Sequence, residues 1–403
     1  MKNKRIIWFV IIILLSNALT FIFTTLGLFP GQRTIRVGIS EYNELKNIAS
    51  ANEKNIAIKN YVKKNYLYDV TDEQLKDGEL HGIVSSLNDP YSSYLSKEEY
   101  LRLMEEMEGS FVGVGIYLTG SKDSFITVVS PIDDSPAFKA GIKTGDVILK
   151  VDGVEYSSDS MEKAISKIRG EKGTEVTLTI ARNTGDENKI FDVTLIREEI
   201  KVNTVNYEIL EGNLAYIRVS QFDETTEKDF ENALKKATED KAKGIILDLR
   251  NNPGGLLNIC VNMIDNFFDE GLIVYTENRE GVRQETYNAH KGKINLPLIL
   301  LVNKGSASAS EIFAGAIKDN KRGKIIGEQT FGKGIVQTII PLSEGDGLKL
   351  TVTEYFTPSG TSIHGIGVKP DIEITIPEDA EGIGPEFLET DTQLKKAIEI
   401  LQK

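Results

Sequence analysis

Residues 298–311 read Leu-Ile-Leu-Leu-Val-Asn-Lys-Gly-Ser-Ala-Ser-Ala-Ser-Glu. The five apolar residues at the start indicate a strand that is buried on both faces, which is typical of a sheet covered by helices on both sides. A helix is expected directly after the serines, at 312–318, so the serines lie in a strand-to-helix turn. The N-terminus of a helix has unpaired N–H groups that can stabilise a developing oxyanion. Alternatively, these serines only cap the helix.

Strands and helices alternate on both sides of this stretch. Apolar strands separated by helices predict an α/β core, and two antiparallel strands near its end give it a mixed sheet. An amphipathic helix at 391–402 closes the chain. The expected strands are 214–219, 244–249, 272–276, 298–302, 334–340 and 348–356, and a helix is expected at 224–239.

Two modules with different patterns precede this core. From 41 to 107 the apolar spacing is helical, with a break at 88–92. Ser96 followed by Glu99 is the pattern of a capping box, which predicts another helix there. After Gly109 the period changes to short β runs with two short helices between them. The sequence therefore predicts a small helical domain and a β-rich domain before the α/β core.

The composition excludes several classes of protein. The 403 residues carry 47 Lys and Arg against 60 Asp and Glu, a net charge of −13, which argues against a general nucleic-acid binder. Hydrophobic residues make up 40% of the chain and charged residues 27%, which is an ordinary globular composition. Cys260 cannot form an internal disulfide, and the three histidines show no metal-ligand spacing, so we expect no zinc site.

The N-terminus predicts an extracytoplasmic location for the rest of the chain. Residues 6–29 carry no charge. As a helix they reach about 36 Å, more than the roughly 30 Å of a hydrocarbon core. The positive-inside rule places Lys2, Lys4 and Arg5 in the cytoplasm. The run is longer than the apolar part of a usual signal peptide, and no clear cleavage site follows at 29–32, so we favour an uncleaved anchor over a cleaved signal peptide.

A lysine between two glycines lies 25 residues after Ser308, in the run Thr330-Phe331-Gly332-Lys333-Gly334. Such a lysine can act as a general base only if burial lowers its pKa, since a solvated ammonium has no lone pair to accept a proton. The other interpretations are a solvated turn lysine and a phosphate loop. The phosphate loop is disfavoured because glycine stands at 334, where Ser or Thr would bind magnesium, and because a strand follows.

A third run of this kind is Asp248-Leu249-Arg250-Asn251-Asn252-Pro253-Gly254-Gly255, which follows another buried strand. Its Gly-Gly turn can present backbone N–H groups inward, although it could also be an ordinary connection. Because such turns follow strands of one α/β unit, we expect the turns at 248–255, 303–311 and 330–334 to meet at one edge of the layer.

Together these runs resemble the carboxyl-terminal processing peptidases, or tail-specific proteases, which are serine peptidases of family S41 with a Ser-Lys dyad. The likeness extends from about residue 45 to about residue 376 and does not include the apolar N-terminal run. The matching runs are LNDPYSSY at 87–94, DLRNNPGG at 248–255, NKGSASASE at 303–311, TFGKGIVQ at 330–337 and TPSGTSIHGIGVKPD at 357–371.

The resemblance implies roles for individual residues. Ser308 is the expected nucleophile and Lys333 the general base. Gln337 is the expected orienting residue for the lysine, and Asp319 is the alternative, since some members use an Asp 11 residues after the serine. Neither a metal nor an organic cofactor is implied. The expected oxyanion hole consists of the backbone N–H groups of Gly255 and Ala309.

The β-rich module resembles a PDZ domain in its bacterial, circularly permuted arrangement. In such a domain, backbone N–H groups hold a chain terminus while the peptide adds as a strand beside the sheet. Arg169, at the end of the second helix, could contact the protease body and relay peptide occupancy. Met161, Ala164 and Ile168 would also face the groove. The residues expected to bind peptide are Phe111, Val112, Gly113, Val114, Gly115, Ile116, Ile165 and Arg169.

The resulting expectation is a membrane-anchored serine endopeptidase that binds exposed C-termini of proteins or peptides and cleaves upstream. It would be secreted if the N-terminal run is cleaved, and apolar helical stripes could form a homodimer. One alternative is a catalytically silent PDZ scaffold or receptor, against which the intact Ser308, Lys333 and Gln337 argue. Another is a Ser-His hydrolase using His290 or His364, but no G-x-S-x-G elbow is present.

The fold class expected for this chain is multidomain α/β. Its segments are a cytoplasmic tail and transmembrane helix at 1–30, a helical domain at 41–108, a PDZ β-barrel at 109–198, an α/β protease core with a mixed sheet at 199–380 and a helical tail at 381–403.

Overall fold

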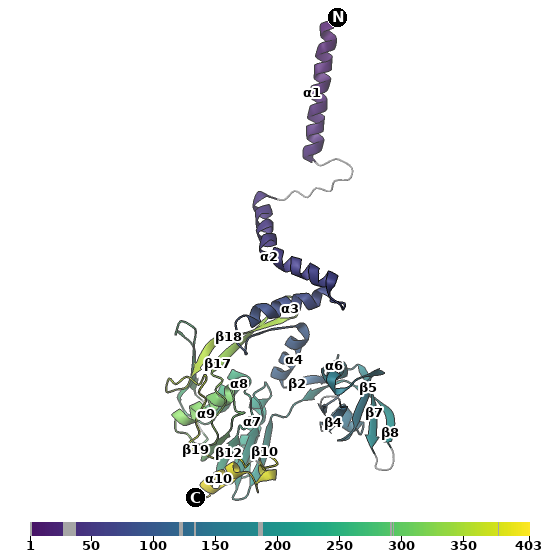
Figure 1. The fold of residues 1–403 in the computed structure, drawn as a ribbon. Helices are drawn as coiled ribbons and strands as arrows, with labels where there is room; N and C mark the ends of the chain where they lie inside the picture. Colours follow the sequence, from purple (N-terminus) through teal and green to yellow (C-terminus); the bar gives the residue numbers. More distant parts are fainter. Residues whose placement is uncertain are drawn as a thin grey trace. The chain divides into compact units, whose positions relative to one another are not determined.

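The computed structural model separates the chain into two units, Met1–Glu79 and Leu80–Lys403 (Figure 1). The end of the predicted anchor and the residues around 29–32, where a cleavage site was sought, lie outside the described residues. The described residues are 2–26, 38–120, 124–132, 134–183, 188–290, 292, 294–377 and 379–403.

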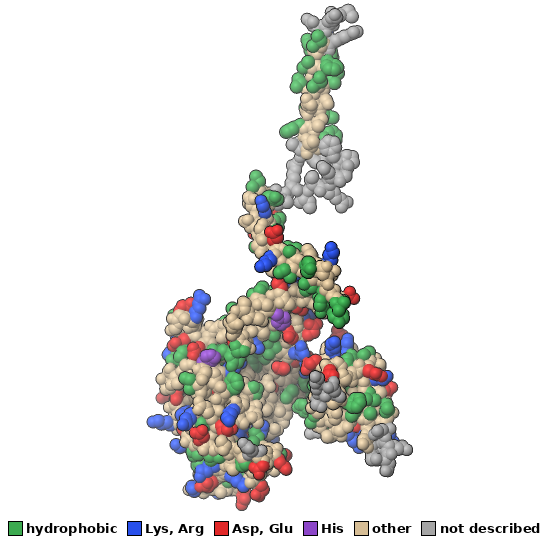
Figure 2. Space-filling model, in the orientation of Figure 1, with side chains coloured by type: hydrophobic (Ala, Val, Ile, Leu, Met, Phe, Trp, Pro, Cys, Tyr) green, Lys and Arg blue, Asp and Glu red, His purple; other side chains and the backbone are tan. Residues whose placement is uncertain are grey.

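The first unit is helical, with α1 at Lys2–Leu26 and α2 at Ile39–Asn65, followed by the start of α3 at Asp72–Ser85. Within α1, the segment Ile6–Thr24 has a mean hydropathy of 2.6 and none of it is buried. Apolar side chains line much of this helix (Figure 2). Its length and composition are those of a membrane span, and an N-terminal signal sequence meets the same criteria.

The main sheet of the second unit runs in the order β10-β11-β12-β15-β16-β19. The pair β10–β11 is antiparallel and the following pairs are parallel, so the sheet is mixed. The antiparallel strands expected at 334–340 and 348–356 are not part of it, because they pair in a separate sheet. The strands are β10 Val205–Leu210, β11 Leu214–Val219, β12 Gly244–Asp248, β15 Leu298–Val302, β16 Lys324–Gly327 and β19 Ile372–Glu373.

Both faces of this sheet are covered, which explains its doubly apolar strands. In β11, Ala215, Ile217 and Val219 belong to the core shared with α7 (Thr226–Glu239), α8 (Leu257–Asp265) and α9 (Ala309–Asp319). Leu214 and Tyr216, which alternate with them, pack with α10 (Thr392–Leu401) on the other face. The segment 381–403, expected as a tail, thus supplies one layer of the core.

A second, antiparallel sheet contributes to the same core, and its strand β17 begins just after the lysine run. Its order is β1-β18-β13-β14, and β17 also pairs with β18. Strand β1 comes from inside the segment expected to be purely helical, because three residues are too few to show a period in sequence. Its pairing with β18 attaches the loop before it to this sheet. The strands are β1 Ser93–Leu95, β13 Gly271–Glu277, β14 Arg283–Ala289, β17 Ile335–Pro341 and β18 Gly347–Phe356.

The β-rich module forms its own sheet in the order β3-β4-β5-β7-β8, with β6 on β5, around its own apolar core. The stretch expected as one strand at 111–118 is two strands: β2 (Ser110–Gly113) pairs with β9 (Glu198–Lys201), and β3 (Ile116–Thr119) pairs with β4. The capping box at Ser96 is present and starts α4 (Lys97–Glu108). The remaining elements are β4 Ile126–Pro131, α5 Pro136–Lys139, β5 Val147–Val151, β6 Val154–Glu155, α6 Met161–Ile168, β7 Glu175–Asn183 and β8 Asn188–Ile196.

Candidate active site

The turns after β12, β15 and β16 converge at the carboxyl edge of the main sheet, as the sequence predicts. Ser306 Oγ donates a hydrogen bond to the Leu249 carbonyl over 2.8 Å, which joins the first two turns. The N–H of Phe331 in turn donates to the Ser306 carbonyl over 3.0 Å. Ser306 is fully buried, so these bonds are shielded from water. The small hydroxyl residue at 306 therefore holds all three turns together.

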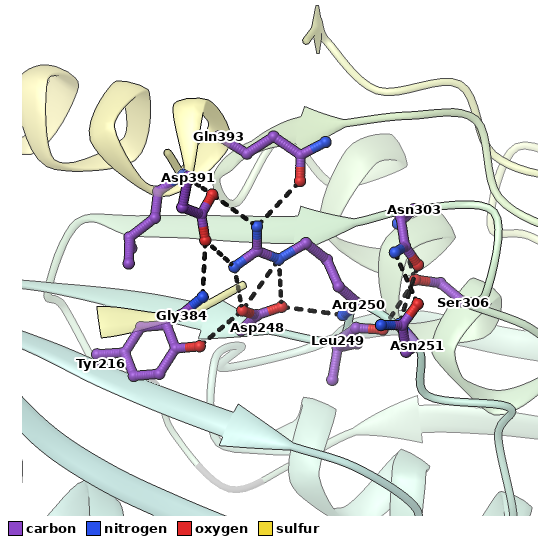
Figure 3. Close-up of polar contacts among 11 residues, drawn as sticks. Tyr216, Asp248, Leu249, Arg250, Asn251, Asn303, Ser306, Gly384, Asp391 and Gln393 are labelled. Atoms are coloured by element: carbon purple, nitrogen blue, oxygen red, sulfur yellow. Dashed lines mark hydrogen bonds and ion pairs between the residues drawn. The ribbon is translucent and has the colours of Figure 1, made fainter. Parts of the chain in front are cut away.

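The turn after β12 is also fixed from the opposite face of the sheet, through the fully buried Arg250 (Figure 3). Its guanidinium donates to Asp248 at 2.6 Å and, with both terminal nitrogens, to Asp391 at 2.8 Å, and it also donates to Gln393 at 3.0 Å. Burial lowers the pKa of Arg250, but Asp248 and Asp391 outweigh that effect and raise it above its ordinary value. Asp391 also caps α10. This ion network attaches the last helix to the turn.

Ser308 has a backbone conformation that few residues other than glycine adopt, with φ 55° and ψ −115°. Such strain persists only where the surroundings impose it, and it is frequent at functional positions. The side chain is 6% exposed, and its Oγ lies 3.3 Å from the Tyr355 hydroxyl. Burial raises the pKa of Tyr355 to about 12, so the phenol remains protonated at physiological pH.

The carboxylate of Glu311 joins the serine turn to the lysine run. It is fully buried and accepts hydrogen bonds from the N–H of Ser308 at 2.9 Å and from the N–H of Lys333 at 2.8 Å. The N–H of Gly332 at 2.7 Å and Thr330 Oγ1 at 2.5 Å also donate to it. A buried carboxylate needs such donors to compensate for lost hydration. These bonds have no local signal in the sequence, because the lysine run begins 19 positions after Glu311.

Lys333 is half-buried, and its environment suits a general base. Burial lowers the pKa of Lys333, and Lys349 lowers it further, whereas Asp89 and Glu311 act in the opposite direction. Its Nζ lies 5.0 Å from the centroid of the Tyr91 ring. In the part of the chain that the structure describes, no hydrogen bond joins Ser308 Oγ to Lys333 Nζ.

The two candidates for orienting the lysine differ in position. Gln337 follows Lys333 on β17, and its amide donates to the Ile335 carbonyl at 3.4 Å and to Thr351 Oγ1 at 3.5 Å. Asp319 is the last residue of α9, about 15 Å along the helix axis from Ser308, and it accepts the Ser359 N–H. Asp319 therefore binds the loop that contains Ser359, whereas Gln337 lies on the strand that follows Lys333.

The expected oxyanion groups lie next to Ser308. A Cβ on Gly254 would fall 2.8 Å from the Ser308 Cβ and 3.1 Å from the Ala309 nitrogen, so the two turns are in contact. At Gly255, φ is 140° and a Cβ would fall 2.1 Å from the Phe222 carbonyl, so only glycine fits. Two backbone hydrogen bonds join this turn to Phe222: the Phe222 N–H donates to the Gly254 carbonyl, and the Leu256 N–H donates to the Phe222 carbonyl. The Gly255 N–H takes part in neither bond. Ala309 is the first residue of α9, where the N–H has no intrahelical partner.

The structure gathers most of the predicted peptide-binding residues around a groove of about 200 Å³ in the β-rich module. Val112 is not part of this lining, because side chains alternate along β2 and its side chain points away from the face that carries Phe111. Ala164 is fully buried in the module core. Arg169 Nη1 donates to Glu105 of α4 at 2.7 Å, and its guanidinium lies 4.9 Å from the Phe111 ring. The predicted residues that line the groove are Phe111, Gly113, Val114, Gly115, Ile116, Ile165, Ile168 and Arg169.

Among the described residues, no hydrogen bond joins a histidine to Ser308. His290 follows β14, and the exposed His364 lies in the loop beside Gly334. Within the described residues, Ser308 Oγ has the Tyr355 hydroxyl as its hydrogen-bond partner, and no group of three or more His, Cys, Asp or Glu could hold a metal ion. These observations do not favour the Ser-His alternative.

Replacing Glu311 by glutamine tests the carboxylate's place in the fold. The amide NH₂ would face N–H donors, so we expect Glu311→Gln to lower the free energy of unfolding by about 2 to 3 kcal/mol, measured by urea denaturation. Glu328→Gln is the matched control, because Glu328 pairs with the exposed Lys304 at 3.5 Å and its loss should cost less than about 1 kcal/mol. Equal stability of the two variants would show that the carboxylate does not hold the turns.

Comparison with known proteins identifies the family. The family model "Peptidase family S41" matches residues 213–374, "PDZ domain" matches 112–195 and "Activating protease CtpB N-terminal domain" matches 31–99. A carboxy-terminal-processing protease of Bartonella bacilliformis is 45% identical over 329 residues, which cover 80% of this chain and 75% of that protein. The carboxy-terminal processing protease CtpA of Bacillus subtilis is 36% identical over 384 residues, which cover 94% and 79%.

The fold is also found among solved structures. The photosystem II D1 C-terminal processing protease is similar with a TM-score of 0.50 and 31% sequence identity, covering 87% of this chain and 92% of that one. These relatives do not favour the interpretation as a silent scaffold. The chain therefore belongs to the carboxy-terminal processing serine proteases of peptidase family S41.

Proposed function

We propose that Ser308 is the nucleophile and Lys333 the general base of this protease. Ser308 Oγ attacks the scissile carbonyl carbon while Lys333 Nζ takes its proton, and the N–H groups of Gly255 and Ala309 stabilise the oxyanion. The C–N bond then breaks and Lys333 returns the proton to the leaving amine. Water hydrolyses the acyl-enzyme with Lys333 again as base. The observation that carries this proposal is the Glu311 carboxylate, which binds the N–H groups of both Ser308 and Lys333.

Gln337 is proposed to orient Lys333 when the lysine turns toward the serine. It lies on β17, four residues after Lys333, and its amide is held only by long hydrogen bonds, so little is lost when it changes partner. Asp319 is disfavoured for this role because its carboxylate accepts the Ser359 N–H at the far end of α9.

The PDZ groove is proposed to bind the free C-terminus of a protein or peptide substrate. Backbone N–H groups of Gly113, Val114 and Gly115 would hold the carboxylate, and the side chains of Ile116 and Ile165 would bind an apolar terminal residue. Phe111 and Arg169 complete the groove, and cleavage would then occur upstream of the bound terminus. Val112, which lies outside the lining, is left with a structural role in β2.

The apolar α1 is proposed to anchor the chain in the cell membrane, with the catalytic part outside the cytoplasm. The proposed segments keep the boundaries 1–30, 41–108, 109–198, 199–380 and 381–403, and the last of them packs on the protease core through α10. The exposed Ile48, Ile56 and Tyr61 of α2 are apolar side chains that a homodimer contact would cover.

The activity is tested with the full chain in detergent micelles and an unstructured protein that ends in apolar residues. New termini, read by mass spectrometry, should depend on Ser308 and Lys333, with Ser308→Ala and Lys333→Ala each lowering turnover roughly a thousandfold or more.

The pH dependence of turnover tests the role of the lysine as base. Because burial lowers the pKa of Lys333, activity should rise as the pH increases through that lowered pKa, and it should be lost at lower pH, where the lysine is protonated. Turnover retained by Lys333→Ala would contradict the proposed dyad. Cleavage that is unchanged when the C-terminus of the substrate is amidated would contradict the proposed role of the groove.

Arg169 is proposed to relay occupancy of the groove to α4, since it contacts Glu105 there. Arg169→Ala should slow cleavage of a long substrate with a free C-terminus by roughly tenfold, while folding is unchanged. Arg102→Ala is the matched control. Arg102 lies on α4, as does Glu105, and it pairs with the exposed Glu162 of α6 at 3.2 Å, outside the groove. Equal activity of Arg169→Ala and the parent on long substrates would show the proposal to be wrong.

A further inference from the structure

We propose that Tyr91 is a positioning residue for Lys333, whose ring face holds the lysine ammonium away from Ser308 until the amine loses its proton. This inference rests on the proposed function of Lys333 as general base. It assigns a role to the loop 88–92, which the sequence marks only as a break between helices.

The Tyr91 ring lies where a cation–π contact requires it. Lys333 Nζ is 5.0 Å from the ring centroid, within the roughly 6 Å over which the negative ring face attracts a cation. Ser308 Oγ meanwhile is paired with the Tyr355 hydroxyl at 3.3 Å. Proton transfer needs the two dyad atoms at about 2.6 to 3.2 Å, and no hydrogen bond joins them among the described residues, so the lysine amine must move toward the serine before the serine can be activated.

The loop that carries Tyr91 is built onto the sheet that carries the lysine. Asp89 accepts the Tyr91 N–H at 3.0 Å and the Ser92 hydroxyl at 2.6 Å. Ser92 Oγ in turn accepts a hydrogen bond from the N–H of Thr351 on β18 at 2.9 Å. The residues after Ser92 form β1, which pairs with β18. β18 also pairs with β17, which begins at Ile335, two residues after Lys333. The ring and the lysine are therefore attached to neighbouring strands of one sheet.

The charged groups that face Lys333 come from each neighbouring element. Asp89 lies in the loop before β1, Lys349 on β18 and Glu311 on α9. Burial raises the pKa of Asp89, but hydrogen bonds from Ser92 and Thr351 outweigh that and leave it below its ordinary value, so this carboxylate is charged. Asp89 and the Tyr91 ring therefore both favour the ammonium, against the effects of burial and Lys349.

The attraction between ring and lysine depends on the charge of the lysine. A neutral amine has no cationic interaction with the ring face, and the neutral amine is also the form that accepts the serine proton. Deprotonation therefore weakens the contact with Tyr91 at the point where Lys333 becomes competent as a base. The ring thus helps set the pH at which Ser308 becomes reactive.

The test measures how fast a small fluorophosphonate labels Ser308 as a function of pH, in the full chain in detergent micelles. Without the ring, the ammonium is less stable, so Tyr91→Leu should move the acidic limb of the profile to lower pH by about half a unit to one unit. Tyr91→Phe keeps the ring and should retain the parent's profile. Tyr94→Phe is the matched control, because it removes the hydroxyl bond to Asp346 at 2.8 Å from β1, the strand that follows this loop, and leaves the Tyr91 ring in place.

A comparison of two aromatic variants at position 91 tests the inference even if Tyr91→Leu does not fold. Pentafluorophenylalanine at position 91 has nearly the shape of phenylalanine but an inverted ring quadrupole, so it should shift the limb to lower pH relative to Tyr91→Phe. Identical limbs for these two variants, or an equal shift in Tyr94→Phe, would overturn the inference. Labelling of Ser308 that persists unchanged in Lys333→Ala would instead overturn the proposed function, so the two failures are distinguishable.

Discussion

The arrangement of this protease site depends on one buried carboxylate. Glu311 accepts hydrogen bonds from the backbone of the serine turn on one side and of the lysine run on the other. The serine turn follows β15 and the lysine run connects β16 to β17, so the carboxylate joins two connections that are separate along the chain. A buried anion without such donors would be strongly destabilising, so the fold is constrained to bring both runs to it. The strained backbone of Ser308 is one consequence of that constraint.

The other contacts of the site extend this junction to distant parts of the chain. Arg250 ties the turn before Gly255 to Asp391 of the last helix. On the other side, Arg169 in the peptide groove contacts Glu105 of α4, and α4 begins just after β1. The loop before β1 holds Tyr91 at Lys333. One series of contacts therefore runs from the groove to the lysine, and such a series allows the occupancy of one to influence the other.

Much of this fold was predictable from sequence because its signals are local. The doubly apolar strands 244–249 and 298–302, the capping box at Ser96 and the Gly-Gly turn at 254–255 each follow from a few neighbouring residues. The resemblance between short runs in this chain and known peptidases supplied Ser308 and Lys333. Strand β1 was missed because three residues carry no period. The stretch expected as one strand at 111–118 forms two strands, because β2 pairs with the distant β9 whereas β3 pairs with the neighbouring β4.

The parts of the site that were not predictable depend on pairings between distant residues. Asp391 lies 141 positions from Arg250, Tyr355 lies 47 from Ser308, and Tyr91 meets Lys333 across most of the second unit. No spacing rule connects such residues, since only the folded sheets bring them together. Glu311 belongs to the matching run at 303–311, but its role becomes apparent only when the lysine run is placed beside it.

The central claim is that Ser308 forms the acyl-enzyme, and the most direct test is to trap that species. Acid quenching during turnover of a protein substrate, followed by peptide mapping with mass spectrometry, locates the acyl group. The account predicts a substrate fragment attached to the tryptic peptide Gly305–Lys318 at Ser308, and its absence in Lys333→Ala. An acyl group on another residue, or steady cleavage by a Ser308→Ala chain, would contradict the account.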